Sequence, residues 1–184
     1  MRWKGLPTCV STQDEAQQSL TDDRDQTFVV IVSADEQTTG RGRAGRSWSS
    51  SADAGIYLSI GIPGPMSVTG AEQWPRRIAE AVVGALREHA GVVARVREPN
   101  DIYVGERKLG GILIDTASTR SDVFDRVIVG VGINVLGEHS DIGGRPATSI
   151  FAETGAGAAS LSQQREPLSR AIAHAALGVL VNPR

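Results

Sequence analysis

The stretch Ile-Tyr-Val-Gly-Glu-Arg-Lys-Leu-Gly-Gly-Ile-Leu-Ile at residues 102–114 predicts a β-hairpin. Residues 102–104 and 109–114 are rich in β-branched and aliphatic side chains, which favour strands, and residues 105–107 between them form a turn signal. The next apolar run, residues 127–135, is nearly continuous and predicts a strand covered on both faces. Three consecutive strands with a hairpin among them indicate an antiparallel or mixed sheet, not a doubly wound parallel one.

The rest of the chain supplies further strands and helices. Strands are predicted at residues 28–32, 55–62 and 92–96, and helices at residues 72–89, 147–153 and 167–181. Pro63-Gly64-Pro65 is expected to end the second of these strands, Pro75 suits the first turn of a helix, and residues 154–160 are expected to form a loop. Because strands outnumber helices, the predicted class is α+β, with a mixed β-sheet flanked by helices.

The composition fits one globular domain over residues 1–184. Hydrophobic residues make up 40% and charged residues 22%, which excludes a disordered chain, and a net charge of −2 argues against a general polyanion binder. We expect a cytoplasmic location, because the sequence has neither an apolar run of ~20 residues nor a secretory signal. With Cys9 alone and His89, His139 and His174 scattered, we expect no disulfide within the chain and no metal site.

Residues 37–51 are too polar for a core and too long for a simple turn. Within them, residues 40–48 read Gly-Arg-Gly-Arg-Ala-Gly-Arg-Ser-Trp. Glycines allow close approach of the backbone to a ligand, arginine forks match phosphate and carboxylate oxygens, and Trp48 offers a flat apolar face. This pattern indicates a loop that closes over a phosphorylated ligand and is mobile when empty. The pattern alone is also compatible with a solvated or RNA-binding arginine-glycine loop.

Three further segments carry polar residues in unusual places. Lys108 enters a strand beside Gly110 and Gly111, where a ligand could lie against the backbone, although this segment alone favours a hairpin with an exposed lysine. Asn134 lies in an apolar strand and must be hydrogen-bonded, with backbone as the expected partner. Residues 11–14 could cap a helix.

Taken in order, these segments resemble the catalytic domain of biotin protein ligase, also called biotin–acetyl-CoA-carboxylase ligase. That family carries Ser-Thr-Asn near the start, a Gln before a GRGRxGRxW loop, Lys-Trp-Pro-Asn-Asp, Arg-Lys-x-(Ala/Cys/Gly)-Gly-Ile-Leu and a strand ending in Gly-Ile-Asn. The matching residues are Ser11-Thr12-Gln13, Gln37, 40–48, Pro99-Asn100-Asp101, 107–113, Gly132-Ile133-Asn134 and Pro146-Ala147-Thr148-Ser149. The resemblance covers roughly residues 6–153 and implies a fold of the class II aminoacyl-tRNA synthetase and biotin protein ligase type.

The resemblance also implies a reaction. Such enzymes join the carboxylate of biotin to the α-phosphate of ATP, bound with Mg²⁺, to give biotinyl-5′-AMP, and a lysine of a biotin carboxyl carrier domain then attacks this anhydride. By this matching the catalytic residues are Arg41, Arg43 and Lys108. The residues implied for biotin are Ser11, Thr12, Gln13, Gln37, Arg41, Gly42, Arg43, Lys108, Gly111 and Ile112. The residues implied for the nucleotide are Arg43, Arg46, Trp48, Asn100 and Asn134. Biotin, ATP and the carrier protein are the expected partners, without DNA or membrane, and a homodimer is left open.

The chain departs from the family pattern in three places. Arg97-Glu98 replaces Lys-Trp, and this carboxylate would repel phosphate unless Arg95 or Arg97 pairs with it. Gln13 replaces Asn. The length leads us to expect neither an N-terminal DNA-binding domain nor the small C-terminal β domain. Alternative functions are a lipoate or octanoyl transferase, which shares the fold, and a biotin or biotinyl-adenylate binder with weakened turnover.

Overall fold

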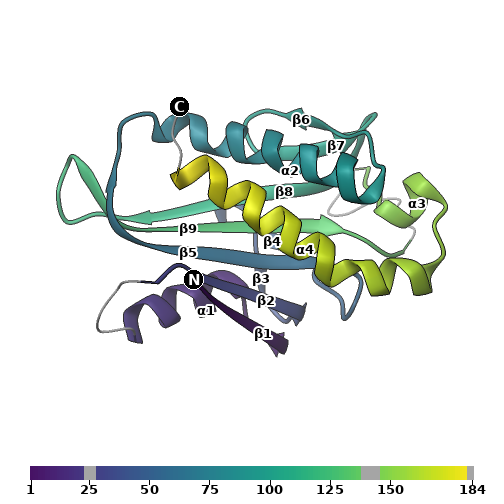
Figure 1. The fold of residues 1–184 in the computed structure, drawn as a ribbon, viewed down its shortest axis with the longest axis horizontal. Helices are drawn as coiled ribbons and strands as arrows, with labels where there is room; N and C mark the ends of the chain where they lie inside the picture. Colours follow the sequence, from purple (N-terminus) through teal and green to yellow (C-terminus); the bar gives the residue numbers. More distant parts are fainter. Residues whose placement is uncertain (23–27, 138–145, 182–184) are drawn as a thin grey trace.

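The computed structural model describes residues 1–22, 28–137 and 146–181, and Figure 1 shows their arrangement. Within these residues a seven-stranded sheet has the order β1-β2-β5-β9-β8-β7-β6. Its strands are β1 (Arg2–Cys9), β2 (Val30–Gln37), β5 (Gly55–Ser67), β6 (Arg95–Arg97), β7 (Asp101–Val104), β8 (Arg107–Ala117) and β9 (Val123–Asn134). The pair β1–β2 is parallel and the other neighbours are antiparallel. The predicted mixed sheet flanked by helices is therefore confirmed.

Helices cover both faces of this sheet (Figure 1). They are α1 (Thr12–Asp22), α2 (Trp74–Ala90), α3 (Ile150–Thr154) and α4 (Ala158–Val181), with 3₁₀ turns η1 (Arg43–Gly45) and η2 (Ala71–Gln73). Helices α2 and α4 pack on one face with the main core, and α1 packs on the other with a smaller cluster. As predicted, Pro75 lies in the first turn of α2, and Gly91 ends that helix with a φ of 67°.

Strand β9 shows how the alternation of side chains separates the two faces. Its odd-numbered residues from Val127 to Ile133 are buried in the core under α2 and α4. Ile128 instead packs with α1, and the following even-numbered residues are Gly130, Gly132 and Asn134. Because successive strand side chains point to opposite faces, this second face of β9 continues from a small apolar cluster into a surface almost without side chains.

Several strands differ in extent from the prediction. Strand β2, expected at residues 28–32, runs over Val30–Gln37, because its pairing with β1 continues past the apolar run. Strand β5 does not stop at Pro63 but continues to Ser67, with a register shift between Pro63 and Met66. An irregularity of this kind accommodates prolines, which have no N–H for the ladder. Strand β6 is shorter than predicted because the Val92 N–H bonds to the Leu86 carbonyl at the end of α2.

Two further elements differ from the prediction. Helix α4 begins at Ala158 and includes Pro167 in its interior, because Leu161, only 4% exposed, anchors the preceding turns in the core. The expected short helix at residues 147–153 is α3, which begins only at Ile150, after Ser149 accepts a capping hydrogen bond. Strand β1 was not predicted, since most of its residues are exposed and carry no alternating apolar pattern.

Candidate active site

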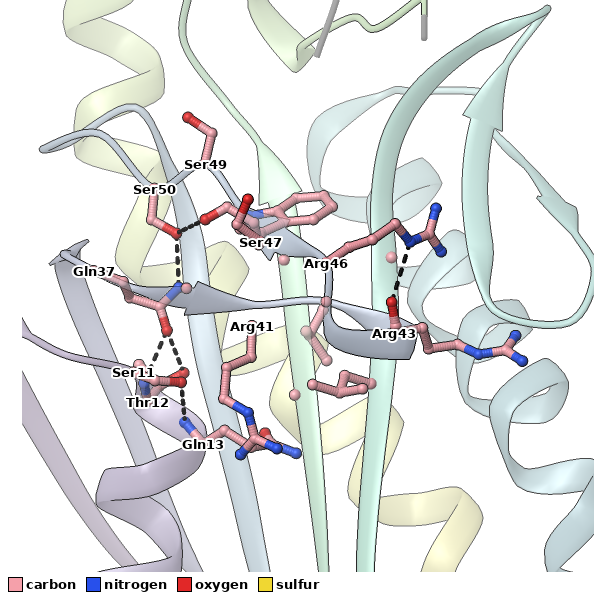
Figure 2. Close-up of a pocket in the computed structure, with 18 of the residues that line it drawn as sticks. Ser11, Thr12, Gln13, Gln37, Arg41, Arg43, Arg46, Ser47, Ser49 and Ser50 are labelled. Carbon is pink, nitrogen blue, oxygen red and sulfur yellow. Dashed lines mark hydrogen bonds between the residues drawn. The ribbon is translucent and has the colours of Figure 1, made fainter. Parts of the chain in front are cut away.

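A cavity of about 1150 Å³ lies between the start of α1, the segment after β2, and strands β7 to β9. Every residue that the sequence analysis assigned to catalysis, biotin or nucleotide lines this cavity; Figure 2 shows part of it. These residues are Ser11, Thr12, Gln13, Gln37, Arg41, Gly42, Arg43, Arg46, Trp48, Asn100, Lys108, Gly111, Ile112 and Asn134. The fold thus brings together four sequence segments, while the roles of the individual residues remain predictions.

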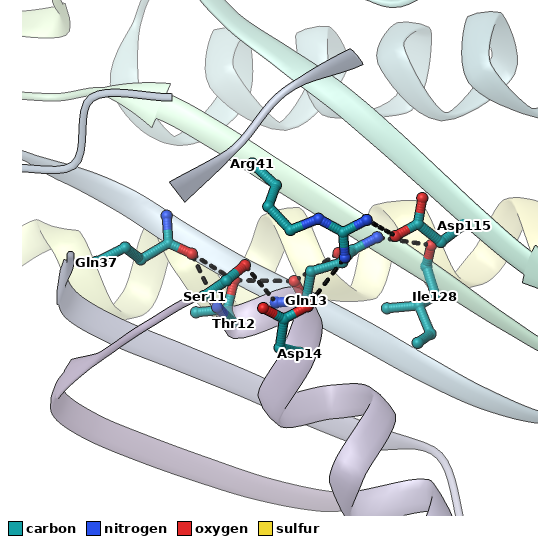
Figure 3. A network of polar contacts seen from close by, with 9 residues as sticks. Ser11, Thr12, Gln13, Asp14, Gln37, Arg41, Asp115 and Ile128 are labelled. Atoms are coloured by element: carbon teal, nitrogen blue, oxygen red, sulfur yellow. Dashed lines mark hydrogen bonds and ion pairs between the residues drawn. The ribbon is translucent and has the colours of Figure 1, made fainter. Parts of the chain in front are cut away.

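An uncharged polar cluster forms where α1 begins (Figure 3). The Gln37 Oε1 atom accepts hydrogen bonds from Thr12, from its backbone N at 2.8 Å and its Oγ1 at 3.1 Å, and Gln37 Nε2 donates to Ser50 Oγ at 2.7 Å. The Ser11 hydroxyl accepts from the Gln13 N–H at 3.3 Å, so the predicted helix cap is confirmed. This cluster presents fixed donors and acceptors of the kind that recognise a neutral polar ring.

Gln13, which replaces the family Asn, is accommodated by a glycine. Its Nε2 donates to the Ile128 carbonyl at 3.2 Å, and its Oε1 accepts from Ser59 Oγ at 2.9 Å. A Cβ atom on Gly130 would lie 2.6 Å from that Oε1. The longer side chain therefore fits because the strand beneath it has no side chain at residue 130.

Arg41 bridges three parts of the site (Figure 3). Its Nη1 lies 2.9 Å from Asp14 Oδ1 on α1, and its Nη2 lies 3.0 Å from Asp115 Oδ2 on β8. The side chain is 42% exposed. These ion pairs are accessible to solvent and therefore weak, so an anionic ligand can compete with either carboxylate for the guanidinium.

The segment that carries Arg41 has local structure. Strands β3 (Gly40–Arg41) and β4 (Ser47–Trp48) pair across η1, in which Ala44 has a φ of 55°. The Gly42 N–H donates to the Arg46 carbonyl at 2.7 Å, and Arg46 Nε donates to the Arg43 carbonyl at 3.1 Å (Figure 2). The arginines are thus displayed from a small hairpin. Whether this hairpin moves when empty stays a prediction.

Arg43 connects the hairpin to the Pro-Asn-Asp segment. Its Nη1 donates to Asn100 Oδ1 at 3.0 Å, while Asn100 Nδ2 donates to the Ile112 carbonyl at 2.5 Å. The Ile112 N–H in turn donates to the Asn100 carbonyl at 2.8 Å. The side chain of Ile112 is 3% exposed and packs in the core. Any contact of Ile112 with a ligand would therefore involve its backbone.

Lys108 is held in place, so the interpretation as an exposed hairpin lysine is wrong. Its Nζ lies 2.7 Å from Asp101 Oδ1, with both side chains 18% exposed, and 5.4 Å from the centroid of the Trp48 ring. The Lys108 N–H donates to the Pro146 carbonyl, and the Lys108 carbonyl accepts from the Thr148 N–H, both at 2.9 Å. The segment after residue 145 therefore fixes the backbone that presents this ammonium group.

Glycines form part of the floor of the cavity. Gly111 on β8 pairs with Gly132 on β9. A Cβ atom on Gly132 would lie 2.6 Å from the indole of Trp48, so the ring packs directly over the strand. The Trp48 Nε1 is buried and has no hydrogen-bond partner among the described residues. Asn134 Nδ2 donates to the Thr148 carbonyl at 2.9 Å, which confirms the predicted backbone partner.

The cavity carries a surplus of positive charge. Four of its lining residues are cations, and two, Glu36 and Asp101, are carboxylates. Because the chain as a whole has a net charge of −2, this surplus is local. A cavity with converging guanidinium groups and an ammonium group is suited to a ligand with carboxylate or phosphate groups.

Glu98 lies outside the set of lining residues. Its Oε1 is 3.0 Å from Nη1 of Arg76 on α2, and its side chain is 67% exposed. The compensating pair with Arg95 or Arg97 does not form: Arg95 bonds to Glu106 at 2.5 Å, and Arg97 lies over the Tyr103 ring. The departure from the family at this position therefore leaves the charge of the cavity unchanged.

Sequence reasoning missed several lining residues, among them Ser50, Ser59, Gly130 and Ala147. Serines and glycines of this kind carry no motif, and only the pairing of β5 with β9 brings Ser59 beside Gly130. The described residues contain no group of three His, Cys, Asp or Glu side chains arranged to hold a metal, and His139 falls outside them. No described helix is long and apolar enough to span a membrane.

Comparison with known proteins assigns the class. Residues 9–134 match the model of the Biotin/lipoate A/B protein ligase family, and the chain belongs to this family. The bifunctional ligase/repressor BirA of Bacillus subtilis is 35% identical over 111 residues, which are 60% of this chain and 34% of that protein. The biotin–[acetyl-CoA-carboxylase] ligase of Paracoccus denitrificans is 33% identical over 131 residues, 67% of this chain and 53% of that one. The chain thus spans from a third to a half of these relatives.

Solved structures agree on the fold. Biotin protein ligase from Leishmania major, in complex with biotinyl-5-AMP, superposes with a TM-score of 0.76 at 23% identity, covering 98% of this chain and 75% of that chain. Biotin protein ligase from Aquifex aeolicus, in complex with biotin and ATP, gives a TM-score of 0.68 at 27% identity, covering 99% and 72%. The fold is therefore that of the biotin protein ligase catalytic domain.

Proposed function

We propose that this domain is a biotin protein ligase, which activates biotin with ATP to biotinyl-5′-AMP and transfers it to a lysine of a biotin carboxyl carrier domain. The observation that carries the proposal is that Arg41, Arg43 and Lys108 line the same cavity as the uncharged cluster of Thr12 and Gln37. Biotin has the matching halves, a neutral polar ring and a carboxylate. The Aquifex aeolicus relative, which is described in complex with biotin and ATP, supports this assignment.

In the first step, a biotin carboxylate oxygen attacks the α-phosphorus of ATP. A P–O bond forms, the bond between the α-phosphorus and the bridging oxygen breaks, and pyrophosphate leaves with that electron pair. The carboxylate is already ionised at neutral pH, so no general base is required. What the reaction requires is alignment and neutralisation of charge. Arg41, Arg43 and Lys108 would supply both.

The nucleotide would lie toward Arg46, Trp48 and Asn134. The indole face of Trp48 is suited to stacking on a base, and its buried Nε1 has no partner among the described residues. We expect Mg²⁺ to arrive with ATP as part of the substrate, held by phosphate oxygens and water. Asp101, the carboxylate on this part of the cavity wall, is paired with Lys108.

In the second step, the amine of the carrier lysine attacks the carbonyl carbon of the anhydride. An amide forms and AMP leaves. The hairpin of β3 and β4, closed over the adenylate, would exclude water until the carrier docks. We place the reaction in the cytoplasm, where ATP and the carrier would meet the enzyme.

The test is formation of labelled biotinyl-AMP and pyrophosphate by this chain with biotin and Mg·ATP. We expect turnover by the wild type and a loss of about a hundredfold or more in Lys108→Met and Arg41→Ala, because each removes charge from the reacting centre. Arg87→Ala, on the exposed last turn of α2, is the matched control. No adenylate from the wild type, or wild-type activity equal to that of Arg41→Ala, would reject the ligase assignment.

The same experiment separates the alternatives. Calorimetric binding of biotin without pyrophosphate release indicates a binder that has lost turnover. Turnover with lipoate or octanoate but not with biotin indicates the related transferases that share the family.

A further inference from the structure

Arg165 lies on α4, beyond residues 9–134 that match the family model. Its guanidinium reaches back to the sheet and contacts two carboxylates with one nitrogen: Nη2 lies 2.7 Å from Asp35 Oδ1 and 2.6 Å from Asp53 Oδ1. The Arg165 side chain is 20% exposed, which makes this the more buried partner of both pairs. Its Nη1 atom is buried and has no hydrogen-bond partner among the described residues, so both ion pairs depend on Nη2 alone.

The two carboxylates bracket the arginine hairpin. Asp35 lies on β2 two residues before the segment 37–51 begins, and Asp53 lies two residues after it ends. The Asp53 N–H also donates to the Asp35 carbonyl at 3.0 Å, so the two ends of the segment lie side by side. Asp53 has a φ of 57°, in the left-handed region that non-glycine residues rarely adopt. Both ends of the hairpin segment are thus fixed by one side chain from a distant helix.

Short hydrogen-bond links connect these ends to the cavity. The Gln37 N–H donates to the Ser50 carbonyl at 3.1 Å, and the two side chains bond to each other at 2.7 Å. Gln37 then accepts both hydrogen bonds from Thr12. The Ser51 carbonyl accepts from the Tyr57 hydroxyl at 3.1 Å. A shift of either end of the segment would therefore move the polar cluster at the start of α1.

We propose that Arg165 is a positioning residue that clamps both ends of segment 37–51. It thereby sets the geometry of the uncharged polar cluster at the start of α1, where Gln37 and Thr12 bond. Without the guanidinium, Asp35 and Asp53 would face each other as unneutralised like charges and push the two ends apart. Arg165 lines no part of the cavity, so it acts only through the segment. The effect on catalysis rests on the proposed function, whereas the effect on the segment itself does not.

The test compares Arg165→Gln with Arg165→Lys and with the control Arg170→Gln. Arg170 is on the same helix, is 51% exposed and pairs with Glu166 one turn away. The first readout is the rate of limited tryptic cleavage after Arg41, Arg43 and Arg46 in the ligand-free protein. We expect Arg165→Gln to raise that rate about tenfold, Arg165→Lys to raise it less, and the control to leave it unchanged.

The second readout separates KM from kcat in adenylate formation. We expect the KM for biotin to rise about tenfold in Arg165→Gln and kcat to fall as well, because segment 37–51 carries Gln37 of the polar cluster and also Arg41 and Arg43 of the reacting centre. If Arg165→Gln does not fold, Asp53→Asn replaces it, since it removes one tether and the facing charge together, and faster cleavage is again expected. Adding Asp53→Asn to Arg165→Gln should restore part of the lost affinity by removing the repulsion.

Two results would overturn the proposal. One is a tryptic cleavage rate in Arg165→Gln equal to that of the wild type. The other is a cleavage rate raised by the same factor in the control Arg170→Gln. A wild type that makes no adenylate would reject the proposed function alone, because the cleavage readout needs no ligand.

Discussion

The Nη1 atom of Arg43 donates to Asn100 Oδ1 at 3.0 Å and so joins two motifs that lie 57 residues apart. The same amide donates from Nδ2 to the Ile112 carbonyl, and Asn100 is 8% exposed. One buried side chain therefore connects the arginine hairpin to the glycine segment of β8.

Replacing this amide tests the connection. We expect Asn100→Ala to lower the free energy of unfolding by about 1–3 kcal/mol, chiefly because the Ile112 carbonyl loses a buried hydrogen-bond partner, while the exposed Arg43 contributes less. Urea denaturation measures the loss. Gln18→Ala, at an exposed position on α1, is the control and should stay within about 0.5 kcal/mol. A loss in Asn100→Ala no larger than in the control would mean that the link is not structural.

Glu98 provides a prediction of no effect. Because Glu98 is 67% exposed and paired with Arg76, we expect Glu98→Trp to change the rate of pyrophosphate release less than about twofold. Glu98→Gln, which removes the charge alone, should behave in the same way. A rate several times higher in both variants would indicate that this carboxylate reaches the nucleotide in the bound state.

Gly132 tests the floor of the cavity. A methyl group there would meet the Trp48 indole at 2.6 Å, so we expect Gly132→Ala to displace the ring and shift the tryptophan fluorescence. It should also weaken binding of a biotinyl-adenylate analogue about tenfold or more. The control is Gly84→Ala on α2, where a Cβ meets no atom within 4 Å. That substitution should raise stability by roughly 0.5–1 kcal/mol through helix propensity and leave binding unchanged. Unaltered fluorescence in Gly132→Ala would contradict the packing.

Cys9 gives the protein a predictable dependence on alkaline pH. Burial, with smaller contributions from Glu15 and Asp14, raises the pKa of the Cys9 thiol from 9.0 to about 11. The folded state thus keeps a proton that the unfolded state loses first. This contribution to stability is fully present below pH 9 and is lost as the pH rises from about 9 through about 11.

The measurement compares urea denaturation of the wild type and Cys9→Ala over that range. The wild type should lose stability relative to the variant between pH 9 and 11, and its native thiol should react with a disulfide reagent at pH 8 far more slowly than the unfolded chain. A constant stability difference between the two proteins across the range would show that the thiol titrates equally in both states.

The sequence predicted those parts of the fold and the site in which neighbouring residues carry the signal. The hairpin of β7 and β8 follows from β-branched residues on either side of Gly105. The arginine-rich segment follows from its composition, although the pairing of β3 with β4 within it was not predicted. The strand β9 follows from its unbroken apolar run. In each case the local preference of the chain and the final packing agree.

Features that depend on distant partners could not be read in this way. Strand β1 is stabilised by pairing with β2 and not by its own pattern. The partner of Glu98 comes from α2, because that helix packs beside β6, although Arg95 and Arg97 are much closer in the sequence. Ser59 and Gly130 meet only through the register of β5 and β9. Arg165 has no motif around it, and only the packing of α4 brings it to Asp35.

The two-faced pattern of β9 has a consequence for the fidelity of folding. If the register of this strand shifted by one residue, Ile133 would point into the cavity where the ligand is expected. Asn134 would then point into the hydrophobic core under α4. A molecule with that error would lose its core and its binding chamber in the same event. Misfolded molecules that still bind the ligand should therefore be rare. Ligand binding by itself then reports that β9 has paired in the correct register.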